Sequence, residues 1–381
     1  MTARRKIRFG IIGLGLMGRE FASAAARWCH LLDLDVEPEI VAICNRSPGK
    51  FDWFQRNFDT IRLATSDYRE LLADETVDAV YAAVPHNLHE EIYVATLQAG
   101  KHLLGEKPFG IDLAANSAIM DAVRAHPELL VRCSSEFPYY PGAYKIYRFI
   151  REGRFGRIIE VHAGLWHSSD LNPDKPINWK RMIEINGEYG CMGDLGMHVV
   201  HLPFRVGWRP KNVRALLSKI ITERSDGQGQ MVPCRTWDNA TLACEVQTAD
   251  QQFPMFLSTK RIAPGEANTW FIRVLGTRFS AEFSTKYPRT LRTLAYTSGG
   301  EQAWQATDIG YEPPYRTITG PIFEFGFTDA MLQMMAAFCD ELSRGPNGPF
   351  PCATPEEAAL SHRLFTAALA SQRTDQVVRL D

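Results

Sequence analysis

Short apolar runs alternate with amphipathic segments along the first third of the chain. The apolar runs have the length and composition of buried strands, and they cover residues 7–12, 39–44, 77–84, 101–104 and 129–133. Segments with helical periodicity lie between them. Strands that alternate with helices predict a parallel sheet with right-handed crossovers, which is a doubly wound α/β fold of the Rossmann type.

The pattern changes after residue 134. Strand-like runs now follow one another with few helices between them, at residues 157–166, 212–220, 239–246, 253–259, 270–275, 279–283 and 291–296. The clearest helical segments are 139–152, 327–342 and 355–370. This half predicts an α+β domain with a large, mostly antiparallel open sheet. An open sheet face of this size exposes more apolar surface than a monomer normally tolerates, so we expect a homodimer or homotetramer.

The first apolar run leads into a glycine turn. The turn reads Gly13, Leu14, Gly15, Leu16, Met17 and Gly18, with the G-x-G-x-x-G spacing of a dinucleotide-binding site. Gly13 permits the tight turn, Gly15 lets the backbone approach a pyrophosphate, and Gly18 lets the next helix pack closely. The N–H groups at the start of that helix suit a phosphate. We therefore interpret residues 1–134 as a dinucleotide-binding Rossmann domain and residues 135–381 as a substrate-binding and oligomerisation α/β domain.

The end of the second strand indicates which cofactor binds. In a dinucleotide fold, an acidic residue here accepts a hydrogen bond from the 2′-hydroxyl of NAD, whereas an arginine neutralises the 2′-phosphate of NADP. Asn45 and Arg46 occupy this strand end, and Asp33 and Asp35 come too early in the chain. We therefore expect NADP to be preferred over NAD. The alternative for Arg46 is a solvated surface residue.

Two more motifs follow strand ends directly, and so fall at the carboxyl edge where doubly wound sheets bind their ligands. The residues that we expect to contact the cofactor there are Val84, Pro85, His86, His89, Glu106 and Lys107. Lys107 is also a candidate for chemistry, because Pro108 restricts it to an extended backbone. A solvated lysine without a catalytic role is the alternative.

One helix interrupts the strands of the second half. Asp194 and His198 are four residues apart on one helical face, and His201 lies on the same side. Three interpretations stay open. In the first, Asp194 is an N-cap and His198 is a core histidine. In the second, all three residues bind zinc, although the usual helical pair is His-x-x-x-His. In the third, Asp194 orients His198 for proton transfer. We expect no metal.

Composition excludes several classes of function. The formal net charge is −2 and the sequence pI is about 6.6, which gives no argument for binding to nucleic acid or to a membrane surface. No apolar run approaches the roughly 20 residues of a membrane span. The eight cysteines form no C-x-x-C pair, so we expect reduced thiols in a cytoplasmic protein.

In their order along the chain, these motifs resemble those of a known family. The similar elements are the Gly13–Gly18 turn, Val84-Pro85 with His89, Glu106-Lys107-Pro108, and Gly193-Asp194 with His198. The chain resembles the glucose–fructose oxidoreductase, inositol dehydrogenase and related (Gfo/Idh/MocA) oxidoreductases over essentially its whole length. The resemblance implies a Rossmann domain followed by an α/β domain whose open sheet often mediates dimers or tetramers.

The resemblance also implies that Lys107, Asp194 and His198 form the catalytic site. Substrate contacts are expected from these three residues and from Trp166 and Trp179, with Lys180 in the same stretch. After the fifth predicted strand many relatives carry Asn or Arg that face the substrate, but this chain reads Ser134-Ser135-Glu136-Phe137-Pro138-Tyr139-Tyr140. This departure prevents the transfer of any named sugar specificity.

We therefore expect an NAD(P)-dependent oxidoreductase that acts on a CH–OH group of a sugar, polyol or sugar derivative. His198 would accept the hydroxyl proton as hydride passes to the nicotinamide, and Lys107 would donate a hydrogen bond to the reacting oxygen. Asp194 would fix the tautomer of His198. Two alternatives are an enzyme of the same fold that uses NAD transiently to cleave glycosides, and a non-catalytic cofactor-binding regulator.

Overall fold

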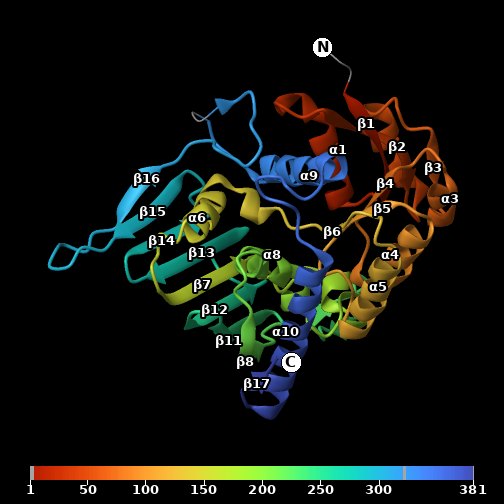
Figure 1. Ribbon diagram of the computed structural model, residues 1–381. Coiled ribbons are helices and arrows are strands. Elements are labelled where there is room, and N and C mark those ends of the chain that lie inside the picture. The colour runs from red at the N-terminus through yellow and green to blue at the C-terminus, as the bar shows by residue number, and fades with distance from the viewer. Residues whose placement is uncertain (1–3, 321–322, 381) are drawn as a thin grey trace.

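A six-stranded parallel sheet organises the N-terminal part of the computed structural model, which describes residues 4–320 and 323–380 (Figure 1). The outermost residues of both predicted domains lie outside these ranges. The strands are β1 Arg5–Ile12, β2 Val36–Cys44, β3 Leu63–Thr65, β4 Ala79–Ala82, β5 His102–Gly105 and β6 Val131–Cys133. Their order is β3-β2-β1-β4-β5-β6, which confirms the predicted doubly wound sheet. The order reverses between β1 and β4, and ligands of such sheets bind beside that point.

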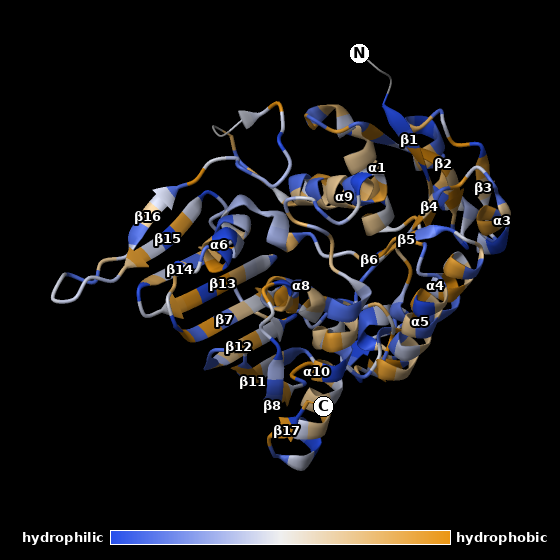
Figure 2. Cartoon of the chain, viewed as in Figure 1, coloured by the Kyte–Doolittle hydropathy of each residue, from blue (hydrophilic) through white to orange (hydrophobic). Residues whose placement is uncertain are grey.

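Helices cover both faces of this sheet. Those between its strands are α1 Leu16–Ala26, α2 Phe51–Asn57, α3 Tyr68–Ala73, α4 His89–Gln98 and α5 Leu113–Ala125. Asp67 and Asp112 cap α3 and α5 by accepting backbone N–H groups. Because both faces are covered, Phe9 and Ile12 of β1 are both buried although they point to opposite faces, and Figure 2 shows mainly hydrophobic colours at β4 and β5.

The second half forms a nine-stranded sheet in the order β16-β15-β14-β13-β7-β12-β11-β8-β17, beside a small β9-β10 hairpin. Its neighbouring strands are antiparallel except for the parallel pair β7 and β12, so the predicted mostly antiparallel sheet is confirmed. The strands are β7 Ile158–Trp166, β8 Pro210–Ser218, β9 Glu223–Ser225, β10 Met231–Pro233, β11 Asn239–Gln247, β12 Gln252–Lys260, β13 Thr269–Gly276, β14 Phe279–Ser284, β15 Thr290–Ala295, β16 Gln305–Asp308 and β17 Val378–Arg379.

One face of the large sheet is packed and the other is open. The helices of this half are α6 Pro141–Arg151, α7 Ile183–Asn186, α8 Cys191–Arg205, α9 Phe327–Arg344 and α10 Pro355–Thr374. Helix α8 lies against β7, β11 and β12, and α10 lies against β8. A Cβ on Gly196 of α8 would lie 2.3 Å from the Phe365 ring of α10, so this glycine permits their close approach. Along the strands, buried residues alternate with half-buried or exposed ones, and hydrophobic and hydrophilic bands alternate in Figure 2.

Helix α9 returns to the first sheet, where it packs against α1 (Figure 1). The Phe338 ring of α9 lies 6.0 Å from the Phe9 ring of β1, and Met331 and Met335 are fully buried in the same core. A segment beyond residue 134 therefore completes the core of the Rossmann unit. An amphipathic pattern predicts a helix but does not identify its partner, and the proposed division at residue 134 stays a prediction.

The predicted and observed elements differ mainly at short strands. β3, β16 and β17 contain three, four and two residues, too few for a recognisable alternation of hydrophobic and polar positions. Helix α1 begins at Leu16, so Leu16 and Met17 of the glycine turn belong to its first turn. None of the helices described is both long and apolar enough to cross a membrane.

Candidate active site

A cavity of about 890 Å³ extends from the carboxyl edge of the first sheet to helix α8. It is lined by Gly15 and Arg46 after β1 and β2, by Lys107 after β5, and by Asp194 and His198 of α8. Residues from three predicted motifs therefore meet in one space, although 92 positions in the sequence numbering separate Gly15 from Lys107. The parallel sheet explains this convergence, because its strands all end at the same edge.

The glycine turn has the backbone geometry that a close ligand requires. Gly13 has a φ of +99°, and a Cβ there would lie 2.2 Å from the carbonyl oxygen of Ala83. A Cβ on Gly15 would meet no atom within 4 Å, so this position is open towards the cavity. Leu16 and Met17 also line the cavity.

Leu14 and Gly18, two of the predicted cofactor contacts, are not among the residues that line the cavity. Leu14 is buried, and its N–H donates to Oδ1 of Asn45 at 3.1 Å. A Cβ on Gly18 would lie 2.3 Å from the carbonyl oxygen of Gly13. Both residues therefore support the turn on the side away from the cavity. Gly18 lets α1 pack closely, as predicted, and Leu14 is part of the core.

Asn45 and Arg46 have different surroundings at the end of β2. Asn45 ties this strand end to the glycine turn through Leu14, and its Nδ2 donates to the carbonyl oxygen of Ser47 at 3.0 Å. Arg46 is exposed and lines the cavity. The arginine is therefore the charged group that β2 presents to a ligand here.

The motif after β4 contributes Val84, Pro85 and His86 to the cavity, but not His89. His89 is buried; its Nδ1 accepts from the Gly110 N–H at 3.2 Å and its Nε2 donates to the Val84 carbonyl at 3.1 Å. Both ring nitrogens are thus used to join two loops, a position that does not favour the predicted cofactor contact of His89. His86 donates from Nδ1 to the Asn186 carbonyl at 3.0 Å, and burial lowers its pKa to about 3.

Lys107 and Asp194 join the two halves of the molecule. The ammonium of Lys107 donates to the carbonyl oxygen of Asp194 at 2.7 Å and to its Oδ1 at 3.1 Å. Lys180 donates to the two carboxylate oxygens at 2.9 and 3.0 Å, and the guanidinium of Arg261 donates to Oδ2. One buried carboxylate is therefore shared by three cations.

These contacts set the protonation states of the cluster. Burial alone would raise the pKa of Asp194, but Lys107, Lys180 and Arg261 hold it well below its usual range. Burial alone would lower the pKa of Lys107, but Asp194 and Glu106 raise it overall. For Lys180, burial outweighs the attraction of Asp194, and with repulsion from Arg261 it lowers the pKa to about 8. Lys107 is thus charged at neutral pH, whereas the ammonium of Lys180 loses its proton at a pH just above neutral.

His198 lines the same cavity but does not hydrogen-bond to Asp194. Its Nδ1 lies 3.4 Å from Oγ of Ser135 and 3.8 Å from Oε2 of Glu136. The predicted orientation of His198 by Asp194 is therefore wrong, because the three cations occupy the Asp194 carboxylate. Burial and the charge of Lys107 hold the pKa of His198 well below its usual range, so the ring is neutral.

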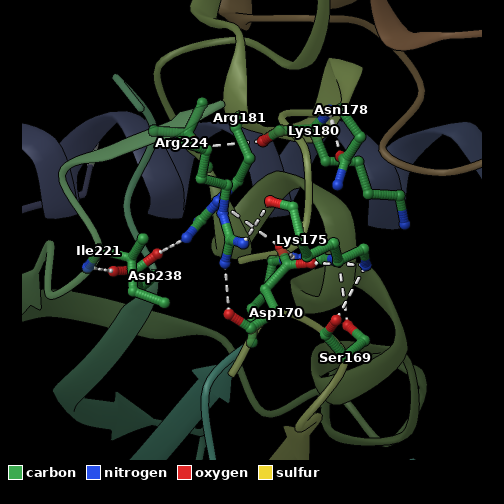
Figure 3. Close-up of polar contacts among 12 residues, drawn as sticks. Ser169, Asp170, Lys175, Asn178, Lys180, Arg181, Ile221, Arg224 and Asp238 are labelled. Atoms are coloured by element: carbon green, nitrogen blue, oxygen red, sulfur yellow. Dashed lines mark hydrogen bonds and ion pairs between the residues drawn. The ribbon is translucent and has the colours of Figure 1, made fainter. Parts of the chain in front are cut away.

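Figure 3 shows how the segment that carries Lys180 is anchored. The next residue, Arg181, is fully buried and forms ion pairs with Asp238 and, at 3.6 Å, with Asp170. Oδ1 of Asn178 accepts the Lys180 N–H at 3.0 Å. The backbone on both sides of Lys180 is thereby fixed, which positions its ammonium beside Asp194.

The two predicted tryptophans lie in different places. Trp179 lines the cavity, and its ring makes an edge contact with His86 at 5.1 Å. Trp166 does not line the cavity: it packs on Phe271 at 4.8 Å and lies beneath the Lys260 ammonium. Successive residues of a strand point to opposite faces, and Leu165 lines the cavity, so Trp166 belongs to the open face. This position does not favour its predicted substrate contact.

The zinc interpretation of the α8 residues gains no support. Asp194 is bound by cations, and His201 is fully buried with its ring 5.3 Å from that of Phe350. Within residues 4–320 and 323–380, no group of three His, Cys, Asp or Glu side chains is arranged to hold a metal ion. His201 is a core histidine in this arrangement.

Sequence reasoning missed two residues of the candidate site, Arg261 and Glu136. Arg261 follows β12 and carries no motif that distinguishes it from a surface arginine. Glu136 stands out in the sequence only as a departure from the family pattern, yet it is 2% exposed and lines the cavity.

The comparisons with known proteins agree with this architecture. The model of the oxidoreductase family with an NAD-binding Rossmann fold (Gfo/Idh/MocA) matches residues 7–132. Residues 7–132 thus match the NAD-binding Rossmann domain of the Gfo/Idh/MocA oxidoreductases. The chain is 28% identical over 221 residues to the levoglucosan dehydrogenase of Pseudarthrobacter phenanthrenivorans, and the match covers 58% of this chain and 56% of that protein.

A second relative is the D-xylose 1-dehydrogenase (NADP(+)) of Hypocrea jecorina, which is 29% identical over 170 residues and 43% of each protein. The chain thus spans about half the length of these two curated relatives. A solved structure of levoglucosan dehydrogenase in complex with NADH and levoglucosan has a TM-score of 0.87 at 22% identity, over 99% of this chain and 100% of that one. This likeness shows that the two share a fold.

Proposed function

We propose that this chain is an NAD(P)-dependent oxidoreductase that interconverts a secondary alcohol and a ketone of a sugar, polyol or sugar derivative. The observation that carries the proposal is the shared cavity, which is lined by Gly15 at the glycine turn and by Lys107, Asp194 and His198. A dinucleotide at the turn and a substrate beside His198 would occupy one continuous space. The match to the family's Rossmann domain and the NADH and levoglucosan held by the structural relative support the same class of reaction.

The residues around the glycine turn fit a dinucleotide. Gly15 leaves open space, and α1 begins without a side-chain cap or an acidic residue in its first turn, so its first N–H groups suit a pyrophosphate. Gly13, Gly15, Leu16 and Met17 would hold this group. When bound, NAD(P) supplies the hydride acceptor or donor.

Three side chains would serve the reacting oxygen. Lys107, kept protonated by Asp194, donates a hydrogen bond that stabilises negative charge developing on this oxygen. His198 is neutral and buried, so it can accept the hydroxyl proton at Nε2, since Nδ1 faces Ser135. Asp194 acts on Lys107 rather than on His198.

The preferred cofactor in this proposal is NADP. Arg46 is exposed at the cavity, while the Asn45 side chain is already bonded to the glycine turn. A 2′-phosphate would therefore meet a cation at the end of β2 and no carboxylate from that strand.

The test is a panel of sugars and polyols supplied with NADP or NAD and followed by the absorbance of the reduced cofactor. We expect turnover with at least one substrate and its loss in Lys107→Ala. Hydrolysis of an aryl glycoside without net cofactor turnover would replace the proposal by the glycoside-cleaving alternative. Cofactor binding without turnover of any substrate would support the regulator instead.

We further propose that the open face of the large sheet forms a homodimer contact, alone or within a tetramer. Leu216 of β8 is 63% exposed, and Trp166 lies on the same sheet away from the cavity. Burying such side chains would stabilise an assembly. Sedimentation should give at least a dimer at micromolar concentration, and Leu216→Glu should weaken it; a monomeric wild-type chain would contradict the proposal.

A further inference from the structure

The carboxyl group of Glu136 is buried in the cavity wall without a hydrogen-bond partner at Oε2 among the described residues. This atom lies 3.8 Å from Nδ1 of His198, and the nearer group, Oγ of Ser135, is a hydroxyl at the long limit of a hydrogen bond. A buried polar atom without a hydrogen-bond partner lowers the stability of the folded protein. Its presence in the cavity wall therefore calls for an explanation, and a functional role is one. The carboxyl group and the imidazole face each other at this separation, and they must come closer before a hydrogen bond forms between them.

His198 needs a proton acceptor other than Asp194. If it took a substrate proton and kept its own, it would become an imidazolium inside a buried site beside the charged Lys107. Asp194 compensates for this charge only in part, because its carboxylate is bonded to Lys107, Lys180 and Arg261. Glu136 is the carboxyl group that faces the second ring nitrogen.

We propose that Glu136 is a positioning residue that ends a proton relay through His198. As the substrate hydroxyl is oxidised, its proton passes to Nε2 of His198 and the proton on Nδ1 passes to the Glu136 carboxylate. Substrate reduction reverses both transfers. Between oxidative turnovers, Nε2 of His198 releases its proton to water as Glu136 returns its proton to Nδ1, which restores the starting tautomer. The hydride leaves or joins the same substrate carbon, so atoms and charges balance while the ring stays neutral. This inference rests on the proposed dehydrogenase function.

The surroundings of Glu136 suit this role. Burial and the nearby charge of Glu106 raise its pKa to about 8, with Lys107 opposing the rise. Glu106 and Lys107 follow β5, His198 comes from α8, and Tyr81 of β4 also interacts with this carboxyl group. Tyr140 faces it from its own segment; burial raises the pKa values of both tyrosines far above 8.

The relay therefore predicts opposite pH profiles for the two directions. Oxidation requires an ionised Glu136, so kcat/KM should rise as the pH increases through about 8. Reduction requires a protonated Glu136 and should slow over the same interval. Lys180 also titrates at about 8 in this cavity, so the variants must separate the two groups.

The decisive variants are Glu136→Gln, Ser135→Ala and Lys180→Met. Glu136→Gln keeps the side-chain volume but cannot accept the proton, and we expect about a 10²-fold loss of kcat/KM and loss of the limb near pH 8. Ser135→Ala should keep that limb, as should Lys180→Met, whatever their effect on KM. A limb that persists in Glu136→Gln, or that disappears in Lys180→Met alone, would overturn the relay.

A second measurement needs neither cofactor nor substrate. Infrared difference spectra of wild type and Glu136→Gln should contain a protonated carboxyl band that disappears as the pH rises through about 8. In ¹⁵N-histidine NMR spectra, His198 should change its hydrogen bonding over the same interval without becoming an imidazolium. The infrared change reports the titration of Glu136 itself, whereas the change at His198 would not occur if the carboxyl group did not interact with the ring. If both occur in a protein that turns over no sugar, the proposed function fails while the Glu136–His198 contact stands.

Discussion

Replacing Asp194 by Asn tests whether this carboxylate holds and charges Lys107 and Lys180, as its contacts indicate, or orients His198. The substitution keeps the shape of the side chain but removes the charge shared by Lys107, Lys180 and Arg261. The carboxylate is 1% exposed, so water cannot replace the lost charge. The three cations are then left to repel one another.

The size of the effect follows from this burial. Removing one partner of a buried ion pair typically costs about 3–5 kcal/mol, because it leaves an uncompensated charge. The pKa of Lys180, already lowered to about 8, should fall further in Asp194→Asn. Lys107 should also lose its raised pKa and its fixed position, and with them its hydrogen bond to the reacting oxygen. We expect kcat/KM to fall by at least about 10²-fold.

Asp170→Asn is the matched control. Asp170 is also fully buried and pairs with Arg261 at 2.9 Å, but it does not line the cavity. Both variants should lose comparable stability in urea unfolding, whereas Asp194→Asn should lose far more activity. Near-normal turnover by Asp194→Asn, or an equal loss of activity in both variants, would refute the assignment of Asp194 to Lys107.

Three further expectations follow from the same residues. Arg46→Ala should weaken NADP binding by about 10- to 10²-fold, with little effect on NAD, because a charge-assisted contact is worth about 1.5–3 kcal/mol; tryptophan fluorescence titration measures it, and equal losses for both cofactors would contradict it. Lys107→Ala and His198→Ala should each slow the chemical step by about 10²- to 10⁴-fold and combine less than multiplicatively, while His201→Ala, outside the cavity, should retain turnover. The folded-state pKa of Lys180 is below its unfolded value, so the unfolded chain binds more protons between pH 8 and about 10.4; stability should rise with pH there, and urea unfolding of Lys180→Met should lack this slope.

The sequence predicts the backbone features of this site better than its side-chain partners. Gly13, Gly15 and Lys107 follow strands, and the parallel topology brings strand ends to one edge whatever the side chains are. His89 and Trp166 have plausible positions in the chain but point away from the cavity. The direction of His89 depends on its bonds to Val84 and Gly110, and that of Trp166 on which face of its strand is packed; neither can be read from spacing alone.

The partner of His198 illustrates the same limit. A spacing of four residues places Asp194 and His198 on one helical face, but it does not reveal competing partners. Lys180 and Arg261 lie on other elements, 14 and 67 positions from Asp194. Together with Lys107 they donate to the Asp194 carboxylate, which makes no hydrogen bond to the neutral imidazole of His198. Glu136 faces His198 because its segment crosses from β6 towards α6, a path that no local motif encodes.

The position of Asp194 has a further consequence for the link between folding and function. Lys107 comes from the end of β5 in the first sheet, whereas Asp194 comes from α8, which packs on the second sheet. Their contact therefore forms only when the two halves are packed together. Buried charges are tolerated only with partners in place, so a loosened contact between the halves would expose the carboxylate to water and weaken the hydrogen bond that positions Lys107. Packing between the halves thus sets the electrostatics of the proposed site, and substitutions in that contact should affect activity without touching any of its residues.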